Sequence, residues 1–506
     1  MKSPGVRFPA IFLLAALMLL PAAAQDLASF EKRITVKTLN NGLTVLVCER
    51  PTAPVFSFFT HVDVGSVQEV PGITGLAHMF EHMAFKGTDK IGTKDYKKEK
   101  AAIDKVEAAY QAYDAERRRP VGRDQEKVKA LEKAWKDAIA EADKYVETDE
   151  FSAIIDRAGG VGLNAFTNSD ETGYFFSFPS NRVELWAYLE SERFLHPVMR
   201  EFYKERDVVL EERRLRTDSQ PIGRLVEQFL AASFMAHPYQ RPVVGWTSDL
   251  TTFSATDAQQ FYRKYYVPAN MVVSVVGDVK TSEVLPIVEK YFGRLPAGPK
   301  PEPTRTVEPP QIAERSVVLR EAAQPFYLEG YHRPDLRHPD DAVYNAISDV
   351  LSKGRTSRLF KALVRDKKIA VFATGFNGFP GDKYPHLFTF FAVPAAGHTA
   401  QEMGEAIRAE LERLKTEDVT EEELKSVKTR AKSDLIRGLA SNQGLANQLG
   451  EAQQRYGDWR EIFREVERIE KVTKEDIRRV ANQTFVPTNR TVAVIETTKP
   501  APQGGK

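Results

Sequence analysis

Residues 75–85 read Gly-Leu-Ala-His-Met-Phe-Glu-His-Met-Ala-Phe, an apolar stretch interrupted by His78, Glu81 and His82. A helix that is apolar nearly all round is expected to be buried. Spacings of three and four residues place the three polar side chains on one helix face. Zinc needs such nitrogen ligands on a fixed scaffold, with a third ligand and an open position for water. The H-x-x-E-H order therefore predicts that His78 and His82 hold one Zn²⁺ per chain while Glu81 takes a proton from the attacking water.

The third ligand is predicted within residues 201–217, whose pattern indicates a helix. Its inward stripe should contain Phe202, Glu205, Val208 or Val209, Glu212 and Leu215. Carboxylates in an apolar stripe are costly to bury unless a cation compensates them. We predict that Glu212 is the third zinc ligand, that Glu205 supports a ligand from behind, and that Glu211 faces solvent. The alternative is surface pairing of both carboxylates with Arg206, Arg213 or Arg214.

The bulk composition limits the class of protein. A chain of 506 residues is too long for one compact core, so at least two domains are expected. A formal net charge of +1 leaves no basic excess for neutralising phosphates, which argues against nucleic acid as a partner. The single cysteine, Cys48, cannot form an intrachain disulfide and lies in an apolar predicted strand, where we expect it to be buried and inert.

Residues 1–24 are expected to be a signal peptide. Lys2 and Arg7 precede an apolar run from residue 10 to 20, and residues 22–24 form an alanine cleavage site. The apolar run is too short to span a bilayer, so no stable membrane anchor is expected. The sequence thus predicts export to the periplasm or to the outside of the cell.

Two related domains are predicted after the signal peptide, at residues 25–295 and 313–497, with a linker at 296–312 and a tail at 498–506. The linker begins in the proline-rich run 295–303. Near the end of the first domain, the helix-capping pattern Ser254-x-x-Asp257 is followed by a V-P-x-N motif at residues 267–270. Both recur 219 positions later, as Thr473-x-x-Asp476 and a second V-P-x-N motif at residues 486–489. A helix start, a turn and an apolar strand thus occur twice, which favours duplication.

Residues 93–149 are expected to form a helical hairpin inserted into the first domain. This segment is rich in Lys, Glu and Ala, and its apolar residues recur every three or four positions. The Pro-Val-Gly-Arg sequence at residues 120–123 divides it into two helices. We favour a solvated structural role, with a partner-docking arm as the alternative.

The chain resembles the pitrilysin/insulinase family of inverzincin metallopeptidases, in the two-domain form that also includes mitochondrial processing peptidase. The resemblance rests on six motifs: 41–45 (NGLTV), 75–88, 164–167 (NAFT), 205–212, 237–239 (HPY) and 357–360 (SRLF). It implies an α/β fold of the α+β type. Each of two similar domains would be a mainly antiparallel sheet with helices packed on one face. It also places the family's zinc-binding glutamate on Glu212.

The resemblance further implies a substrate-binding edge strand at Asn164 and Ala165, which would add a peptide to the sheet through main-chain hydrogen bonds. Aligning residues 353–354 with 86–87 puts Asn345, Ser348 and Asp349 where the first domain has its zinc motif, so the second domain should not bind zinc. The family's second domain supplies an arginine and, seven residues later, a tyrosine. Here Arg365 matches the arginine, but the tyrosine position holds Phe372, or Val371 with a one-residue deletion.

We expect a zinc-dependent endopeptidase that hydrolyses peptides or unfolded protein segments as a homodimer or as a heterodimer with a paralogous chain. One alternative is a catalytic subunit that is active only beside a paralogue bearing the missing tyrosine. Another is a peptide-binding subunit without turnover, although the complete H-x-x-E-H motif argues against it.

Overall fold

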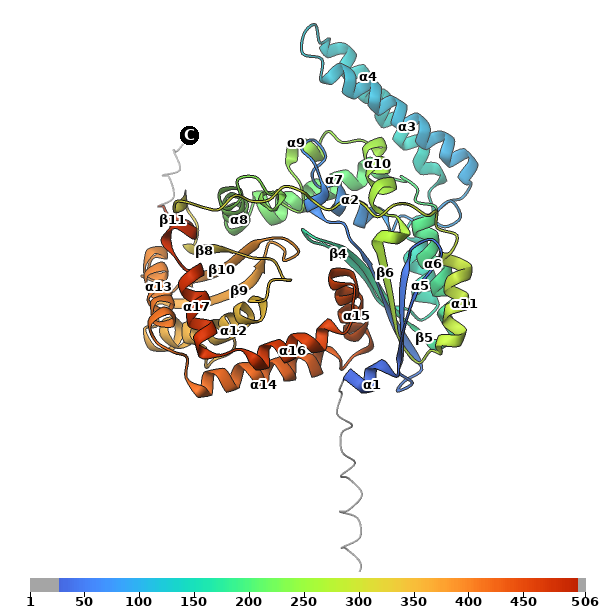
Figure 1. The fold of residues 1–506 in the computed structure, drawn as a ribbon. Coiled ribbons are helices and arrows are strands. Elements are labelled where there is room, and N and C mark those ends of the chain that lie inside the picture. The colour runs from blue at the N-terminus through green and yellow to red at the C-terminus, as the bar shows by residue number, and fades with distance from the viewer. Residues whose placement is uncertain (1–26, 499–506) are drawn as a thin grey trace, which may run out of the picture.

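The computed structural model describes residues 27–498, so the expected signal peptide and all of the tail except Thr498 lie outside the described residues. Two β-sheets, each with its own helices, form the two halves of the chain (Figure 1). None of the helices in the described part is both long and apolar enough to cross a bilayer.

The first sheet has the order β1-β2-β6-β3-β5-β4, and only β2 and β6 run parallel. Its strands are β1 (Ile34–Thr38), β2 (Thr44–Glu49), β3 (Val55–Val62), β4 (Val161–Thr167), β5 (Thr172–Pro179) and β6 (Met271–Gly277). The second sheet has the order β7-β11-β8-β10-β9, and only β7 and β11 run parallel. Its strands are β7 (Arg315–Glu321), β8 (Phe326–Arg333), β9 (Ala370–Phe379), β10 (His386–Pro394) and β11 (Arg490–Thr497).

The two sheets share one topology, because β2 to β6 correspond in order and direction to β7 to β11. Each final strand follows a capped helix: α10 (Ala255–Tyr265) begins with the Ser254–Asp257 capping box and α17 (Lys474–Thr484) with that of Thr473 and Asp476. A short 3₁₀ turn, η6 (Pro268–Asn270) or η8 (Pro487–Asn489), then leads into β6 or β11. The structure confirms the two similar, mainly antiparallel domains.

The remaining helices fall into the same two halves. Those of the first half are α1 (Leu27–Glu31), α2 (Leu76–Met83), α3 (Tyr96–Arg117), α4 (Gln125–Ala142), α5 (Glu150–Arg157), α6 (Val183–Leu195), α7 (Phe202–Arg213), α8 (Pro221–Ser233), α9 (Thr247–Leu250) and α11 (Thr281–Phe292). Those of the second half are α12 (Asp341–Ser352), α13 (Ala400–Thr416), α14 (Glu421–Gly438), α15 (Asn442–Tyr456) and α16 (Glu461–Lys471). No helix or strand of the described chain lies between Phe292 and Arg315.

Each sheet packs one face against helices of its own half. In the first half, Phe56 and Phe58 of β3 contact Trp186 of α6, with ring centroids 5.9 and 5.3 Å apart. In the second half, Ile347 of α12 and Phe388 of β10 lie in the corresponding core. Successive residues of a strand point to opposite faces of its sheet, so each sheet has a second apolar face that these helices do not cover.

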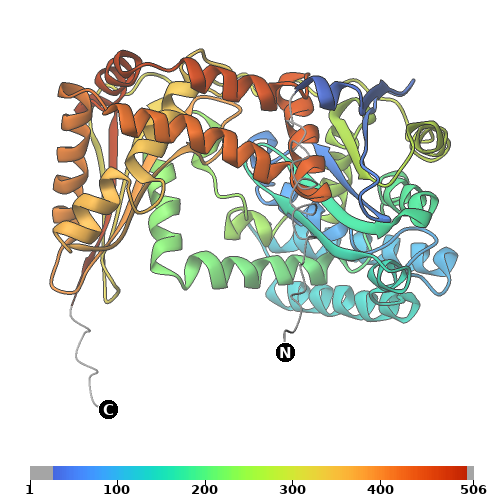
Figure 2. The ribbon, with the colours of Figure 1, turned by 90° about the horizontal axis from the view of Figure 1, so that it is seen from below.

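Each of these second faces is covered by a helix from the other half. Helix α15 packs on β3 and β6 of the first sheet, where Leu445 and Leu449 join a core with Phe59 and Val276. Helix α8 packs on β7 and β11 of the second sheet, where Phe229 lies in an apolar cluster with residues of β11. The two halves therefore exchange one helix each across the molecule (Figures 1 and 2).

The predicted hairpin is present as α3 and α4, and it projects from the body in Figure 1. The middle of the hairpin packs on α7: the Tyr110 and Trp135 rings lie 4.4 and 5.2 Å from that of Tyr203. Arg206 of α7 also donates to the Tyr110 hydroxyl at 2.9 Å. The hairpin thus supports the helix that carries the predicted third zinc ligand.

Cys48 is fully buried on β2, as expected, and burial raises the pKa of its thiol to about 11. A thiol with so high a pKa is protonated at neutral pH and is a poor nucleophile.

Candidate metal centre

The first turn of α2 is held by one glycine and one buried glutamate. Gly75 precedes the helix with a φ of 93°, in the left-handed region that favours glycine, and a Cβ atom there would lie 2.7 Å from the Val244 carbonyl oxygen. The buried Glu69 carboxylate accepts hydrogen bonds from the Gly75 and Ala77 backbone N–H groups, both at 2.8 Å. These bonds satisfy amides that a helix start leaves unpaired, and they position the turn that carries His78.

Three of the predicted residues converge between α2 and α7. His78 Nε2 and His82 Nε2 lie 3.6 and 3.5 Å from the same oxygen, Oε2 of Glu212. The ring centroids of the two histidines are 4.8 Å apart and nearly perpendicular. Two ligands of a tetrahedral zinc ion lie about 3.3 Å apart, since each bond is about 2.0–2.1 Å long. The two imidazoles and the carboxylate are thus spaced as ligands of one such ion.

Glu205 binds the second histidine on the side away from Glu212, and Lys86 binds Glu205 in turn. His82 Nδ1 lies 2.9 Å from Glu205 Oε1, and Lys86 Nζ lies 2.6 Å from Glu205 Oε2. Burial alone would lower the pKa of His82, but hydrogen bonds to Glu205 and Glu212 raise it to about 9. Burial would raise the pKa of Glu205, yet the bonds from His82 and Lys86 lower it to about 2. Glu205 therefore stays ionised and turns Nε2 of His82 toward Glu212.

The buried His78 is already in the form that binds a metal. Burial, followed by the charge of His82, lowers the pKa of His78 to about 4. A neutral imidazole offers a lone pair, and Nε2 of His78 faces Glu212. The donor set of two imidazole nitrogens and one carboxylate oxygen, with the ligand atoms within 4.8 Å of one another, fits zinc.

Glu81 lies beside these ligands without being one of them. Burial raises the pKa of its carboxyl group, and a hydrogen bond with Thr167 opposes this shift. A carboxylate with a raised pKa next to a metal site is suited to accept and return a proton. Thr167 ends β4, so the proton acceptor sits at the end of the first sheet's edge strand.

The inward stripe predicted for α7 is only partly correct. Phe202 is buried and Glu211 is exposed, as expected, and of the two valines it is Val209 that is buried, but Leu215 is 56% exposed. The α-helix ends at Arg213 and continues as a π-helix, η4 (Arg214–Asp218). The wider turn shifts the helical phase, so the pattern that holds up to residue 212 fails beyond it.

The same π-helix supplies a contact that the sequence analysis missed. Arg216 Nη1 lies 2.5 Å from Oε1 of Glu212, leaving Oε2 to face the two histidines. The four-residue spacing of this pair was a usable signal. The surface pairing considered for Arg206 and Arg213 does not occur, because both arginines are buried and bind other partners.

The predicted substrate strand borders the metal centre. β4 is the edge of the first sheet and packs against α2. Asn164 is exposed, and Ala165 pairs with Tyr174 of β5, so one side of the strand remains open to a peptide. The pairing of β4 with β5 shifts between Val161 and Asn164, a local irregularity at the rim of the site.

Arg365 is placed elsewhere. It lies on the π-helix η7 (Phe360–Asp366) of the second half, is exposed, and forms a bidentate ion pair with Asp366. Phe372, on the edge strand β9, is 49% exposed. Within residues 27–498, the contacts of Arg365 do not include His78, His82 or Glu212.

The second half has a counterpart of this site without metal ligands. Helices α12 and α14 meet there as α2 and α7 do in the first half. Asp349, the counterpart of His82, forms an ion pair with Arg430 of α14, and Asn345, the counterpart of His78, accepts a hydrogen bond from Asn377 at 2.8 Å. A guanidinium group thus neutralises the carboxylate where a cation would otherwise be needed.

One further group of metal-ligating side chains occurs in the first half, at Asp89, Glu192 and His196. The buried Glu192 already pairs with Lys90 at 3.3 Å and with Arg294 at 2.7 Å. Both oxygens of Glu192 are thus paired with cations, whereas Glu212 keeps Oε2 facing the two histidines, so the centre between α2 and α7 is the better metal site.

The fold and the site define a chain of two similar α/β halves with a candidate metal centre in the first, and comparisons with known proteins give its family. The family described as "Insulinase (Peptidase family M16)" matches residues 44–116, and "Peptidase M16 inactive domain" matches residues 252–431. The zinc protease PqqE of Helicobacter pylori is 30% identical over 474 residues, covering 91% of this chain and 92% of the relative. The chain therefore belongs to the insulinase family, peptidase family M16.

Other relatives agree with this assignment. The uncharacterized zinc protease YmxG of Bacillus subtilis is 24% identical, covering 88% of this chain and 95% of the relative. The crystal structure of a protease from Helicobacter pylori superposes with a TM-score of 0.76 at 27% identity, covering 92% of this chain and 99% of that one. The periplasmic protease PqqL of Escherichia coli has a TM-score of 0.67 at 17% identity, and this chain spans 48% of its length, so that likeness concerns the fold alone.

Proposed function

We propose that this protein is a zinc-dependent endopeptidase that cleaves peptides or unfolded protein segments. The observation that carries the proposal is the convergence of His78 Nε2, His82 Nε2 and Glu212 Oε2, with Glu81 beside them. Relatives of similar length that are named zinc proteases support it.

The chain's own residues divide the work of hydrolysis. When bound, the zinc ion supplies Lewis acidity, which polarises the scissile carbonyl and makes water more acidic. Glu81 takes the proton of the attacking water at its carboxylate and returns it to the leaving amine. Glu205 fixes the orientation of the His82 ring through Nδ1. The open edge of β4 aligns an extended substrate by main-chain hydrogen bonds at Asn164 and Ala165.

A second candidate function is that of a catalytic subunit needing a paralogous partner. The observation that favours it is the position of Arg365, which is exposed in the second half and, among residues 27–498, bonded only to its neighbour Asp366, with Phe372 in the tyrosine position. A second chain, identical or paralogous, would have to bring such an arginine to the metal centre. We also propose that residues 1–24 direct export, so that the enzyme acts in the periplasm or outside the cell.

The test is metal analysis combined with peptide cleavage. The purified chain should contain one zinc ion, and a chelator should abolish its hydrolysis of unstructured peptides, with zinc restoring it. The assay is repeated with a paralogue that lacks H-x-x-E-H but keeps the arginine and tyrosine. Activity that needs the paralogue supports the subunit function. A chain that binds zinc yet cleaves nothing in either setting contradicts both.

A further inference from the structure

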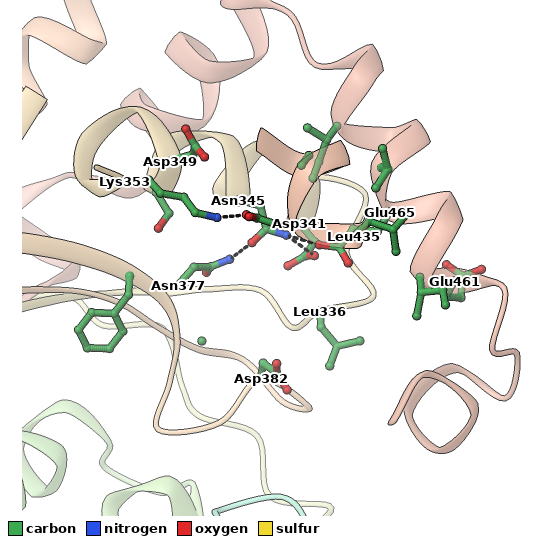
Figure 3. A pocket seen from close by; sticks show the side chains of 18 of the residues that line it. Leu336, Asp341, Asn345, Asp349, Lys353, Asn377, Asp382, Leu435, Glu461 and Glu465 are labelled. Carbon is green, nitrogen blue, oxygen red and sulfur yellow. Dashed lines mark hydrogen bonds and ion pairs between the residues drawn. The ribbon is translucent and has the colours of Figure 1, made fainter. Parts of the chain in front are cut away.

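The second half contains a cavity at the counterpart of the metal centre, and its lining is strongly acidic. The cavity has a volume of about 690 Å³ and lies among α12, β9, α14, α15 and α16 (Figure 3). Seven carboxylates line it: Asp341, Asp349, Asp382, Asp434, Glu451, Glu461 and Glu465. Only two cationic side chains do so, Lys353 and Arg455.

Most of these carboxylates have cationic partners, but one does not. Asp349 pairs with Arg430, Asp434 with Lys353, and Asp382 with Arg455. Glu465 only accepts a hydrogen bond from Asn345 at 3.1 Å and forms no ion pair in the part of the chain that the structure describes. Its side chain reaches the solvent that fills the cavity. Enclosure by the cavity walls, and then the charge of Asp341, raise the pKa of Glu465 to about 7.

A buried histidine in the lining uses only one of its two ring nitrogens for a hydrogen bond within the described residues. His386 is 1% exposed, its Nδ1 lies 2.9 Å from the Tyr384 carbonyl oxygen, and its Nε2 has no hydrogen-bond partner in the described part of the chain. Burial, and then the charge of Arg333, lower the pKa of His386, so the ring is neutral. Nδ1–H then donates to Tyr384, and Nε2 is an unpaired acceptor behind the surface of the cavity.

The cavity does not suit a bare metal ion. Among residues 27–498, no group of three metal-ligating side chains meets in it, since its carboxylates are spread over several elements. Its volume is also far larger than a water molecule's share of about 30 Å³. Apolar side chains lie between the carboxylates, including Leu336, Leu435, Ile462 and Val466. Such a lining accommodates an alkyl stem that ends in a cationic group.

We propose that this cavity binds an ammonium or guanidinium group on an aliphatic stem, with Glu465 as the main charged contact. The group belongs to a free organic diamine or to a lysine or arginine of a bound peptide. The site is independent of the metal centre, because none of its lining residues is a predicted zinc ligand. It occupies the place where the duplicated half has exchanged its metal ligands for Asn345 and Asp349.

The experiment measures binding to the full-length chain in the Glu81→Gln form, which prevents hydrolysis of peptide probes. Calorimetric titrations use three probes: 1,5-diaminopentane, a blocked pentapeptide with one central lysine, and the same peptide with norleucine. Norleucine keeps the alkyl stem and removes the charge. Glu465→Gln removes the unpaired carboxylate, and Glu467→Gln on the same helix is the matched control, because Glu467 is exposed and does not line the cavity.

The diamine, the lysine peptide or both should bind, and chelation of zinc should leave binding unchanged. Glu465→Gln should weaken it about 10–100-fold, as expected for loss of a charged hydrogen bond, while Glu467→Gln has no effect. Binding of the diamine identifies a free cation as a sufficient ligand, and binding of the peptide alone identifies a basic residue. The proposal is overturned if neither cation binds, if the norleucine peptide binds equally well, or if a folded Glu465→Gln protein binds as the parent does. None of these outcomes depends on peptidase activity.

Discussion

Glu205→Gln is expected to weaken zinc binding without removing any zinc ligand. In the structure Glu205 accepts from His82 Nδ1 at 2.9 Å and from Lys86 Nζ at 2.6 Å. The amide keeps the side chain's shape and one neutral acceptor for His82, but it loses the charge. A hydrogen bond to a charged group contributes about 1.5–3 kcal/mol and a neutral one about 0.5–1.5 kcal/mol. The difference of roughly 1–1.5 kcal/mol corresponds to about a tenfold weaker zinc affinity.

Competition between the apo-protein and a chelating dye measures this affinity. Glu211→Gln is the matched control, because Glu211 lies on the same helix, is largely exposed, and pairs with Arg214. Glu205→Ala should lose about 100-fold, since it leaves His82 without an acceptor. Thermal unfolding of the apo-proteins checks that the variants fold. If Glu205→Gln bound zinc like the parent, or if Glu211→Gln were the weaker binder, the proposed role of Glu205 would be wrong.

Glu81→Gln should keep zinc bound but reduce hydrolysis by about 10²–10⁴-fold, because an amide cannot accept the proton; metal analysis beside a peptide assay decides, and loss of the metal would refute the role. Glu423→Gln should lower the free energy of unfolding at neutral pH by about 2–3 kcal/mol. Burial would raise the pKa of Glu423, but the hydrogen bonds from Arg358 lower it to about 2, so the ionised carboxylate stabilises the folded state. In the parent this stabilisation is present above the ordinary pKa of 4.5 and is lost as pH falls toward 2, so in chemical denaturation the difference between the two proteins should vanish in acid. Phe372→Tyr should raise turnover by up to about 10²-fold if the chain acts as a homodimer, and unchanged kinetics in an active homodimer would show that the hydroxyl is dispensable.

Periodicity and spacing predicted much of the molecule because the signals were local. The helix with His78, the capped helices before β6 and β11, and the hairpin all follow from residues close in sequence. Periodicity could not predict the π-helix after Arg213, because a helical pattern assumes a constant number of residues per turn. That assumption placed Leu215 on the buried face, whereas the residue is exposed. The sequence also could not show that Arg365 lies away from the metal ligands of its own chain. A motif indicates which family a residue belongs to, but it does not give the position of that residue in space.

No sequence pattern could predict that α8 and α15 each pack on the sheet of the other half. An apolar helix stripe predicts that a face is buried but not which sheet covers it. Leu445 and Leu449 would satisfy the same pattern on either sheet, yet they pack on the first. Helix α15 approaches β3 closely at Gly450, where a Cβ atom would lie 2.5 Å from the His61 ring. The sequence contains this glycine but does not show which strand it faces.

This exchange makes the chain comparable to a domain-swapped dimer whose two protomers are joined end to end. Cutting the chain between residues 295 and 313 would leave α8 attached to one fragment and α15 to the other. Each fragment alone would expose an apolar sheet face and an unpacked amphipathic helix, a combination that favours aggregation. Produced together, the fragments can cover each other's sheets, so the protein should be recoverable as a non-covalent pair. Neither fragment should give a stable protein by itself, even though each carries a complete sheet.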